Sequence, residues 1–540
     1  MKPTILILPI LVLISFQAQG QAFAFAPSRD ANEATEYVRG YKLAVAQKVF
    51  DALVRARGDI SMQKPTLVLN KKEGRIACFN PDLLQVILDE KAYDLCTTFG
   101  KDSLNALASI LAHELIHYYE KHDWSRNFVR QNENLETSRN LENLDEGKKQ
   151  ETQADYIGGF LAFSVGYNTY GIMPEFLKKA YKAYDLSDDL PGYPSLTDRL
   201  SMVEAAMDIL QELQIVFETA NLLTILGNYA DAATYHGKIL KTYQSREIYN
   251  NAGVNAALAG LALFDPNEMP FVLPLELDPK SRLVSLKNND SEKAARRNTL
   301  LRLALEHFER AVQLDENYPP AYLNKACALA LLGELEDADY CIRKGKKKSS
   351  SPQIASDFIV LEGVIAALQK DSLGALKSWE QAQKQGNAWA KVNIATLQNA
   401  SRHAVNAVIP AKGLEEIEQY QLGDFLQKPQ PDRTVEVEPK IFCGFSQSQL
   451  KQSRLLIHYA NKGKDYVLVQ ETKPNYTGLT LRGIGLGTGQ DKVLEAYGKA
   501  PRHIAILGGS VWVYPETNIF FRFSPQLKVE SWGVYRKSSL

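Results

Sequence analysis

The first part of the chain alternates between helical and strand patterns of apolar residues. Three segments carry apolar residues at the spacing of an amphipathic helix, and two short segments between them have strand character. The predicted elements are helices at 33–57, 104–121 and 151–163 and strands at 66–69 and 75–79. This order predicts an α+β domain over residues 27–212.

The middle of the chain is repetitive. Leu226-Gly-Asn-Tyr followed by Ala232 fits the turn and second helix of a tetratricopeptide repeat. Small residues at the same spacings fit further copies: Ala326, Gly333 and Ala338; Gly363, Ala375, Trp379 and Ala382; and Ala304, Phe308 and Ala311. The pattern predicts an all-α tetratricopeptide-repeat solenoid over 213–405, whose paired helices leave a concave face for a peptide or protein. An unspecialised helical domain is the alternative.

An insertion interrupts one of these repeats. It runs from Asp265 to Asn289, carries four prolines, and includes the apolar piece FVLPL at residues 271–275. Long insertions of this kind are usually functional or unstructured. Two roles remain open: a lid lying in the groove, or an extension of the binding surface.

The last part of the chain has the alternation of strands. After a linker at 406–431, strands are predicted at 454–459 and 465–470, joined by a hairpin turn. We expect a small C-terminal α+β domain over 432–540. The glycines near residue 487 lack GxGxxG spacing, which disfavours phosphate binding. Residues 485–514 resemble the BamE-like module of cell-envelope proteins.

The N-terminus has the pattern of a secretory signal peptide. Lys2 precedes an apolar run at 5–14 and small residues up to Ala26. The run is shorter than the roughly 20 residues that span a bilayer, which disfavours an anchor. We expect cleavage after about residue 26, export to the periplasm or the extracellular space, and no transmembrane segment in the mature chain; association with the outer membrane stays open.

Length, charge and cysteine content narrow the classes further. A chain of 540 residues exceeds the roughly 250–300 at which a single core stops growing, so several domains are expected. The formal net charge of -1 gives no bias toward polyanions, so nucleic acid is not an expected partner. Five cysteines leave at least one unpaired; Cys78 and Cys96 flank one helix and are a possible disulfide pair.

The chemistry of the chain centres on the sequence HELIH. His113 and His117 are four positions apart in a helical segment, so both imidazoles lie on one face and can reach one metal ion. Zinc accepts neutral imidazole nitrogen, and Glu114 would lie beside the open coordination position as the general base. The pattern predicts one Zn²⁺ per chain.

A third ligand is available downstream in the sequence ETQAD. Glu151 and Asp155 are again four positions apart on a predicted helix. Glu151 would complete the protein ligands, and Asp155 would accept the second ring N–H of a ligand histidine, which fixes its tautomer. An ExxxD pair alone is more often a solvated acidic face. Its place downstream of HELIH, followed by an apolar run, favours the metal site.

Both segments resemble one family of enzymes. HELIHYYEKH, residues 113–122, and ETQADYIGG, residues 151–159, are similar to the gluzincin metallopeptidases that include HtpX, CAAX prenyl proteases, Oma-type proteases, BepA and LoiP. The resemblance covers residues 35–210 and implies a zincin-like catalytic domain. With the repeats, the layout is most similar to BepA-like members. The implied site has His113, His117 and Glu151 as ligands, Glu114 as base and Asp155 behind a ligand.

Two further residues take roles only from this resemblance. His122 lies where many members carry a histidine close behind the ligands, although a surface histidine is an equal reading. Tyr193 stands where the family usually has a histidine before proline. Its hydroxyl could stabilise the oxyanion, and packing is the alternative.

We therefore expect an exported zinc endopeptidase that acts in protein quality control of the cell envelope, by Glu-assisted attack of zinc-bound water on a peptide bond. Its substrates would be proteins or peptides, lying extended against an edge strand such as 75–79, and a protein partner would bind the repeats. A chaperone-like or adaptor protein with a slow or latent peptidase site is the rival. A structural zinc site is disfavoured because no cysteine is near the ligands.

Overall fold

The structure is a computed structural model in which two compact units are described. One unit ends at Gln214 and the other begins at Ile215. The described residues are 31–60, 62–71, 75–121, 144–169, 171–186, 195–265, 267–275, 290–398, 413, 415–418, 431–446, 450–460, 464–506 and 509–538. The predicted signal peptide, the hairpin turn after residue 460, His122 and Tyr193 lie outside these ranges.

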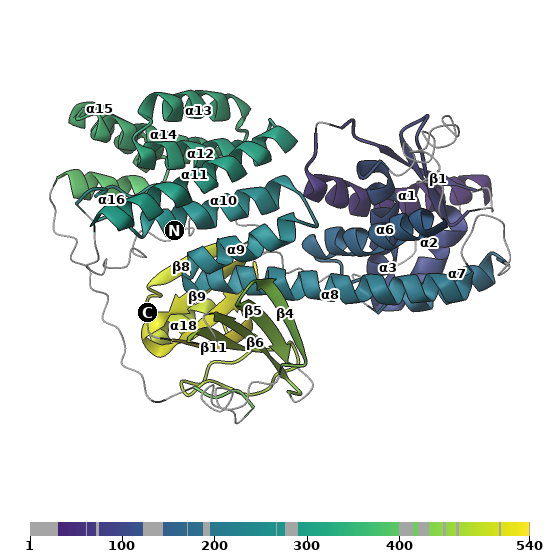
Figure 1. Ribbon diagram of the computed structural model, residues 1–540. Coiled ribbons are helices and arrows are strands. Elements are labelled where there is room, and N and C mark those ends of the chain that lie inside the picture. The colour runs from purple at the N-terminus through teal and green to yellow at the C-terminus, as the bar shows by residue number, and fades with distance from the viewer. Residues whose placement is uncertain are drawn as a thin grey trace. The chain divides into compact units, whose positions relative to one another are not determined.

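The first unit combines helices with a small sheet (Figure 1). Its helices are α1 (Ala31–Arg57), α2 (Glu90–Thr97), α3 (Ser103–Tyr119), α6 (Leu144–Ser164), α7 (Met173–Ala183) and the first part of α8 (Leu196–Leu226); its strands are β1 (Thr66–Asn70), β2 (Ala77–Asn80) and β3 (Gln85–Asp89). All three predicted helices and both predicted strands are therefore present. The α+β character expected for this part is confirmed.

The sheet of the first unit has the order β1-β3-β2. β3 pairs in parallel with β1 and antiparallel with β2, so among the described strands β2 has a neighbour on one side only. This central strand was not predicted, because its apolar run is only Val86 to Leu88. Phe79 of β2 packs on Tyr118 of α3 with ring centroids 4.9 Å apart, which fixes the edge strand against the helix that carries HELIH.

The second unit contains a helical region and a sheet. The helical region consists of the end of α8, α9 (Tyr229–Leu240), α10 (Arg246–Leu261), α11 (Asp290–Leu314), α12 (Pro319–Leu332), α13 (Leu335–Lys348), α14 (Pro352–Leu368), α15 (Ser372–Lys384) and α16 (Ala388–Leu397). Consecutive helices pack on one another, and Figure 1 shows α12 to α15 stacked in layers. The predicted helix pairs are therefore present.

Small residues allow these helices to approach closely. Ala326, Ala338 and Ala375 are fully buried. A Cβ atom at Gly363 would lie 2.4 Å from Nε1 of Trp379, so glycine is required where α14 meets α15. At Gly333 φ is +79°, which ends α12 in the left-handed conformation that glycine adopts without strain.

The C-terminal part forms one antiparallel sheet, ordered β4-β5-β6-β7-β11-β10-β9-β8 among the described residues. Its elements are β4 (Arg433–Glu438), β5 (Ile441–Ser446), β6 (Ser453–Ala460), β7 (Asp465–Thr472), α18 (Gln490–Tyr497), β8 (Arg502–Ile506), β9 (Gly509–Tyr514), β10 (Ile519–Phe523) and β11 (Val529–Lys537). The two strands predicted at 454–459 and 465–470 are β6 and β7. A C-terminal sheet domain is therefore confirmed in outline.

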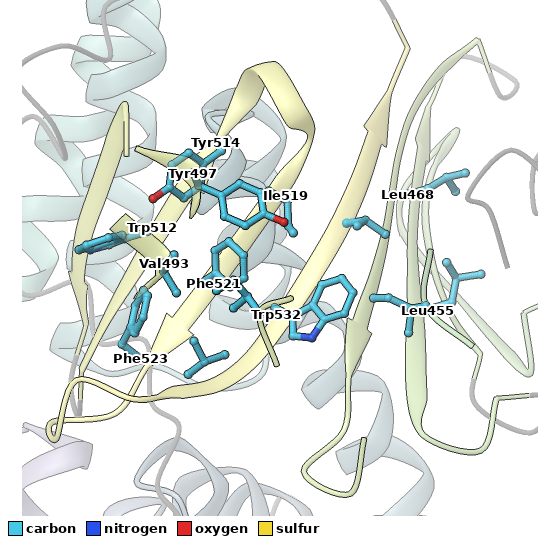
Figure 2. Packing of buried hydrophobic residues seen from close by; sticks show 14 of the residues in the cluster. Leu455, Leu468, Val493, Tyr497, Trp512, Tyr514, Ile519, Phe521, Phe523 and Trp532 are labelled. Carbon is cyan, nitrogen blue, oxygen red and sulfur yellow. The ribbon is translucent and has the colours of Figure 1, made fainter. Parts of the chain in front are cut away.

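Aromatic side chains form the core between this sheet and α18. Trp532 and Phe521 are fully buried on neighbouring strands. Tyr497 of α18 lies 5.1 Å from Phe521 and 5.4 Å from Tyr514, measured between ring centroids. Figure 2 shows these rings gathered between helix and strands. Burial of such large apolar rings supplies most of the stabilisation of a sheet of this size.

Cationic side chains from the sheet satisfy the end of α8. The last carbonyls of a helix have no partner within it. Here Arg502 donates to the oxygen of Ile225 at 2.6 Å, and Lys537 donates to the oxygen of Leu226. Gly227 has φ of +81°, and a Cβ atom there would lie 2.8 Å from the Arg502 guanidinium. The turn glycine predicted for a repeat thus also admits this arginine.

Two predictions concern membranes and thiols. One described helix, α8, is long and apolar enough to cross a membrane by length and composition, and 72% of its apolar window is buried. A core helix of a soluble protein passes the same test, so the predicted absence of a transmembrane segment stays a prediction. No disulfide joins Cys78 and Cys96, so the possible pairing of these two is not formed.

Candidate metal centre

Helix α3 presents both histidines of HELIH from a buried position. Leu111, Ala112, Leu115 and Ile116 are almost fully buried and anchor the helix in its unit. His113 and His117 lie one turn apart, and their side chains are 12% and 10% exposed. Their Nε2 atoms are 3.0 Å apart. The two imidazoles thus converge on one point, as the i, i+4 spacing predicts.

Helix α6 brings the carboxylates to this point. It packs on α3, and the contact is close at Gly158. A Cβ atom at Gly158 would lie 3.0 Å from the backbone nitrogen of His113. Since backbone cannot move aside as a flexible side chain can, glycine here sets the distance between the two helices. Glu151 and Asp155 then project toward the histidines from the preceding two turns.

The three predicted ligands lie within reach of one metal ion. Oε2 of Glu151 is 3.4 Å from Nε2 of His113, and Oε1 is 3.5 Å from Nε2 of His117. One ligand atom from each residue can be chosen so that all lie within 4.8 Å of one another. Ligands about 2.0–2.2 Å from a tetrahedral zinc stand about 3.3–3.5 Å apart. The donor set is one that zinc accepts, and its spacing would admit one metal ion.

Asp155 and Arg199 lie behind the ligands. Nδ1 of His113 is 2.8 Å from Oδ1 of Asp155, a side chain that is only 3% exposed. This bond directs Nε2 of His113 toward the centre, as predicted. Arg199 of α8 donates to Oε2 of Glu151 at 3.1 Å and to Oδ1 of Asp155 at 3.3 Å. The guanidinium therefore bridges both carboxylates and fixes their relative orientation.

The electrostatics of the centre follow from this arrangement. Burial alone would lower the pKa of His113, but the charge and hydrogen bond of Asp155, together with Glu151, raise it to about 10. Burial alone would raise the pKa of Glu151, but His113 and Arg199 hold it well below its usual value. The carboxylate of Glu151 is therefore ionised at neutral pH, as a zinc ligand must be.

The structure brings together four of the seven residues predicted for the site: His113, His117, Glu151 and Asp155. Glu114 is half-buried on the same helix, next to the first ligand. His122 and Tyr193 fall outside the described residues. No role was predicted for Arg199, because nothing in its local sequence points to carboxylates 44 and 48 residues before it.

Comparisons with known proteins add little. No protein-family model matches the chain. An uncharacterized protein of Methanocaldococcus jannaschii is 45% identical over 42 residues, which is 8% of this chain and 49% of that protein. The chain therefore spans about half of the length of this curated relative. Since that protein's name states no activity, the similarity assigns no function here.

Proposed function

We propose that the chain is an exported zinc endopeptidase. The observation that carries the proposal is the convergence of His113, His117 and Glu151, with one ligand atom from each lying within 4.8 Å of the others. This donor set leaves a coordination position open, which distinguishes catalytic from structural zinc sites. Zinc held there would polarise the scissile carbonyl and acidify a water molecule.

Residues of the chain would transfer the protons and position the ligands. Glu114 accepts the proton that the attacking water loses, and it later donates that proton to the nitrogen of the leaving amine. Asp155 accepts the Nδ1 proton of His113, so that Nε2 would bind zinc once its own proton is released. Arg199 donates to both carboxylates and aligns them. No other acid or base is needed for proton balance.

An extended substrate would bind along β2. This strand has a free edge among the described strands, and Phe79 ties it to Tyr118, one residue after His117. Pairing with a strand edge holds a peptide through its backbone, so it selects extended chains rather than particular side chains. Such binding suits an enzyme that degrades misfolded proteins of the cell envelope.

The finer fold assignments belong to the same proposal. A sheet edge beside a HELIH helix and a carboxylate helix is what a zincin-like domain would provide. Helix pairs with buried alanines and left-handed glycines at their turns support a tetratricopeptide array over α8 to α16. The array would bind a protein partner, which is also what the rival chaperone-like function requires.

Glu114→Gln separates these functions. The amide keeps the size of the side chain but cannot accept a proton, so the variant should retain zinc and lose digestion of casein by at least about 100-fold. Zinc content and digestion are measured on the same preparations. Wild-type protein that holds zinc and does not digest would favour the latent or adaptor function. Equal digestion by wild type and variant would exclude Glu114 as the base.

A further inference from the structure

Part of the insertion between α10 and α11 is held by helices much later in the chain. Residues 267–275 are described, without helix or strand structure. The backbone N–H of Val272 donates to Oδ1 of Asn393 at 2.7 Å, and Nδ2 of Asn393 donates to the oxygen of Val272 at 2.8 Å. Asn393 belongs to α16 and is fully buried. The amide side chain of Asn393 thus binds both the N–H and the C=O of Val272.

Apolar contacts accompany these bonds. Phe271 packs on Trp379 of α15 with ring centroids 5.2 Å apart. Val272, Leu273 and Leu275 are 2%, 0% and 1% exposed. Loops that connect two helices usually run over the protein surface. This apolar loop is instead buried against α15 and α16.

Contacts with α14 also hold the site in place. Asn387 caps α16 by accepting from the nitrogen of Trp389 at 3.0 Å, and it donates to Asp357 of α14 at 2.7 Å. The Trp379 ring donates to the oxygen of Val360 at 3.0 Å. α16 and the Trp379 ring are therefore held by bonds that do not involve Phe271–Leu275.

We propose that α15 and α16 form a binding site for extended apolar peptides, which the chain's own Phe271–Leu275 segment fills in cis and which client polypeptides occupy in its place. Asn393 binds only backbone groups of Val272, so its two hydrogen bonds do not depend on the side chain at that position. Trp379 and the surrounding apolar surface select a peptide with an aromatic or aliphatic side chain. Without a peptide the buried amide of Asn393 would lose both partners, so an empty site is disfavoured.

The cis segment, Phe271–Leu275, sets the affinity that a client polypeptide needs in order to bind. A tethered ligand is present at an effective concentration in the millimolar range, so it excludes weak binders and yields to strong or abundant ones. Exposed apolar segments of unfolded proteins are of the latter kind. This site requires neither metal nor hydrolysis, so its test is independent of the peptidase proposal.

Peptide binding to an emptied site tests the proposal. The probe is a fluorescein-labelled peptide with the sequence of residues 267–275, NEMPFVLPL, and anisotropy is measured on the full chain in the presence of a chelator. Replacing Phe271 and Leu273 together by Ser should release the cis segment. The peptide should then bind at least about tenfold more tightly than to wild type, because the intramolecular competitor is gone.

Two matched variants define the site. Asn393→Ala in the emptied background should weaken peptide binding by at least about tenfold, because both backbone bonds are lost. Asn267→Ser, at an exposed position of the same segment, should bind peptide as wild type does. An emptied variant with native helical content that binds no more tightly than wild type would overturn the proposal.

Hydrogen exchange on the wild type gives a second readout that needs no destabilising substitution. Excess unlabelled peptide should accelerate exchange at the Val272 amide and leave the helical amides of α14 unchanged. A Val272 amide that stays equally protected at millimolar peptide would mean that the segment is a permanent part of the fold.

Discussion

Two carboxylates, Glu471 in the C-terminal sheet and Glu151 in the first unit, differ in the groups that their oxygen atoms face. The Glu471 side chain is 3% exposed. Its Oε1 accepts from Nε of Arg522 at 2.7 Å and from Ser531 at 2.8 Å, and its Oε2 accepts from Arg454 at 2.8 Å. Both oxygens are occupied by donors that belong to the fold.

Glu151 is arranged differently. Its side chain is 24% exposed, and one oxygen accepts from Arg199. Both oxygens also face imidazole nitrogens of His113 and His117, at 3.4 and 3.5 Å. Imidazoles can share a metal with a carboxylate, whereas arginines only neutralise it. The first arrangement is a closed ionic cluster, and the second is the proposed ligand set.

The largest expected effect is at the closed cluster. Glu471→Gln removes the anion that Arg522 and Arg454 share, although Arg454 keeps its ion pair with Glu218, and the free energy of unfolding should fall by about 3 kcal/mol. Guanidinium unfolding followed by tryptophan fluorescence measures it, with Glu495→Gln on the exposed face of α18 as the control. A loss below about 1 kcal/mol would mean that Glu471 does not stabilise the sheet.

A smaller effect is expected behind the ligand set. Asp155→Ala removes the acceptor for Nδ1 of His113, so zinc affinity should fall roughly 10- to 100-fold without being abolished. A competition titration with a zinc-binding dye measures the change. An unchanged affinity would mean that Asp155 only pairs with Arg199.

The smallest effect is the pH dependence of the closed cluster. Burial would raise the pKa of Glu471, but Arg522 and Arg454 lower it from 4.5 to about 2. A carboxyl group whose pKa is lower in the folded state contributes its full stabilisation above the pKa of the unfolded state. This stabilisation is lost as the pH falls through the pKa of the folded state. Between pH 7 and pH 4 the stability difference between wild type and Glu471→Gln should narrow by about 1 kcal/mol. Urea unfolding at both pH values would contradict this if the difference stayed constant.

The ligand set could be predicted from sequence because its geometry is local. His113 and His117 share one helix, as do Glu151 and Asp155, and helical periodicity alone places each pair on one face. The roles of Gly158 and Arg199 depend on how helices cross, which no local pattern encodes. The place of Glu151 and Asp155 downstream of HELIH predicted that the two helices would meet, and α3 and α6 do pack on each other.

The closed cluster could not be predicted. Glu471, Arg454 and Arg522 lie on three strands, and their meeting depends on the order of the sheet rather than on any spacing along the chain. Strand β3 was not predicted for a similar reason. A run of three apolar residues does not distinguish a central strand from a turn. By contrast, the helix pairs were predictable because their small residues recur at fixed intervals.

Zinc titration of matched variants tests the central distinction most directly. Isothermal titration of metal-free wild type should give one zinc per chain. Glu151→Ala should lower the zinc affinity by at least about 100-fold, which is more than the decrease expected for Asp155→Ala. Glu471→Gln should bind zinc as wild type does, because its cluster holds no metal. Equal zinc binding by wild type and Glu151→Ala would contradict the assignment of His113, His117 and Glu151 as a metal centre.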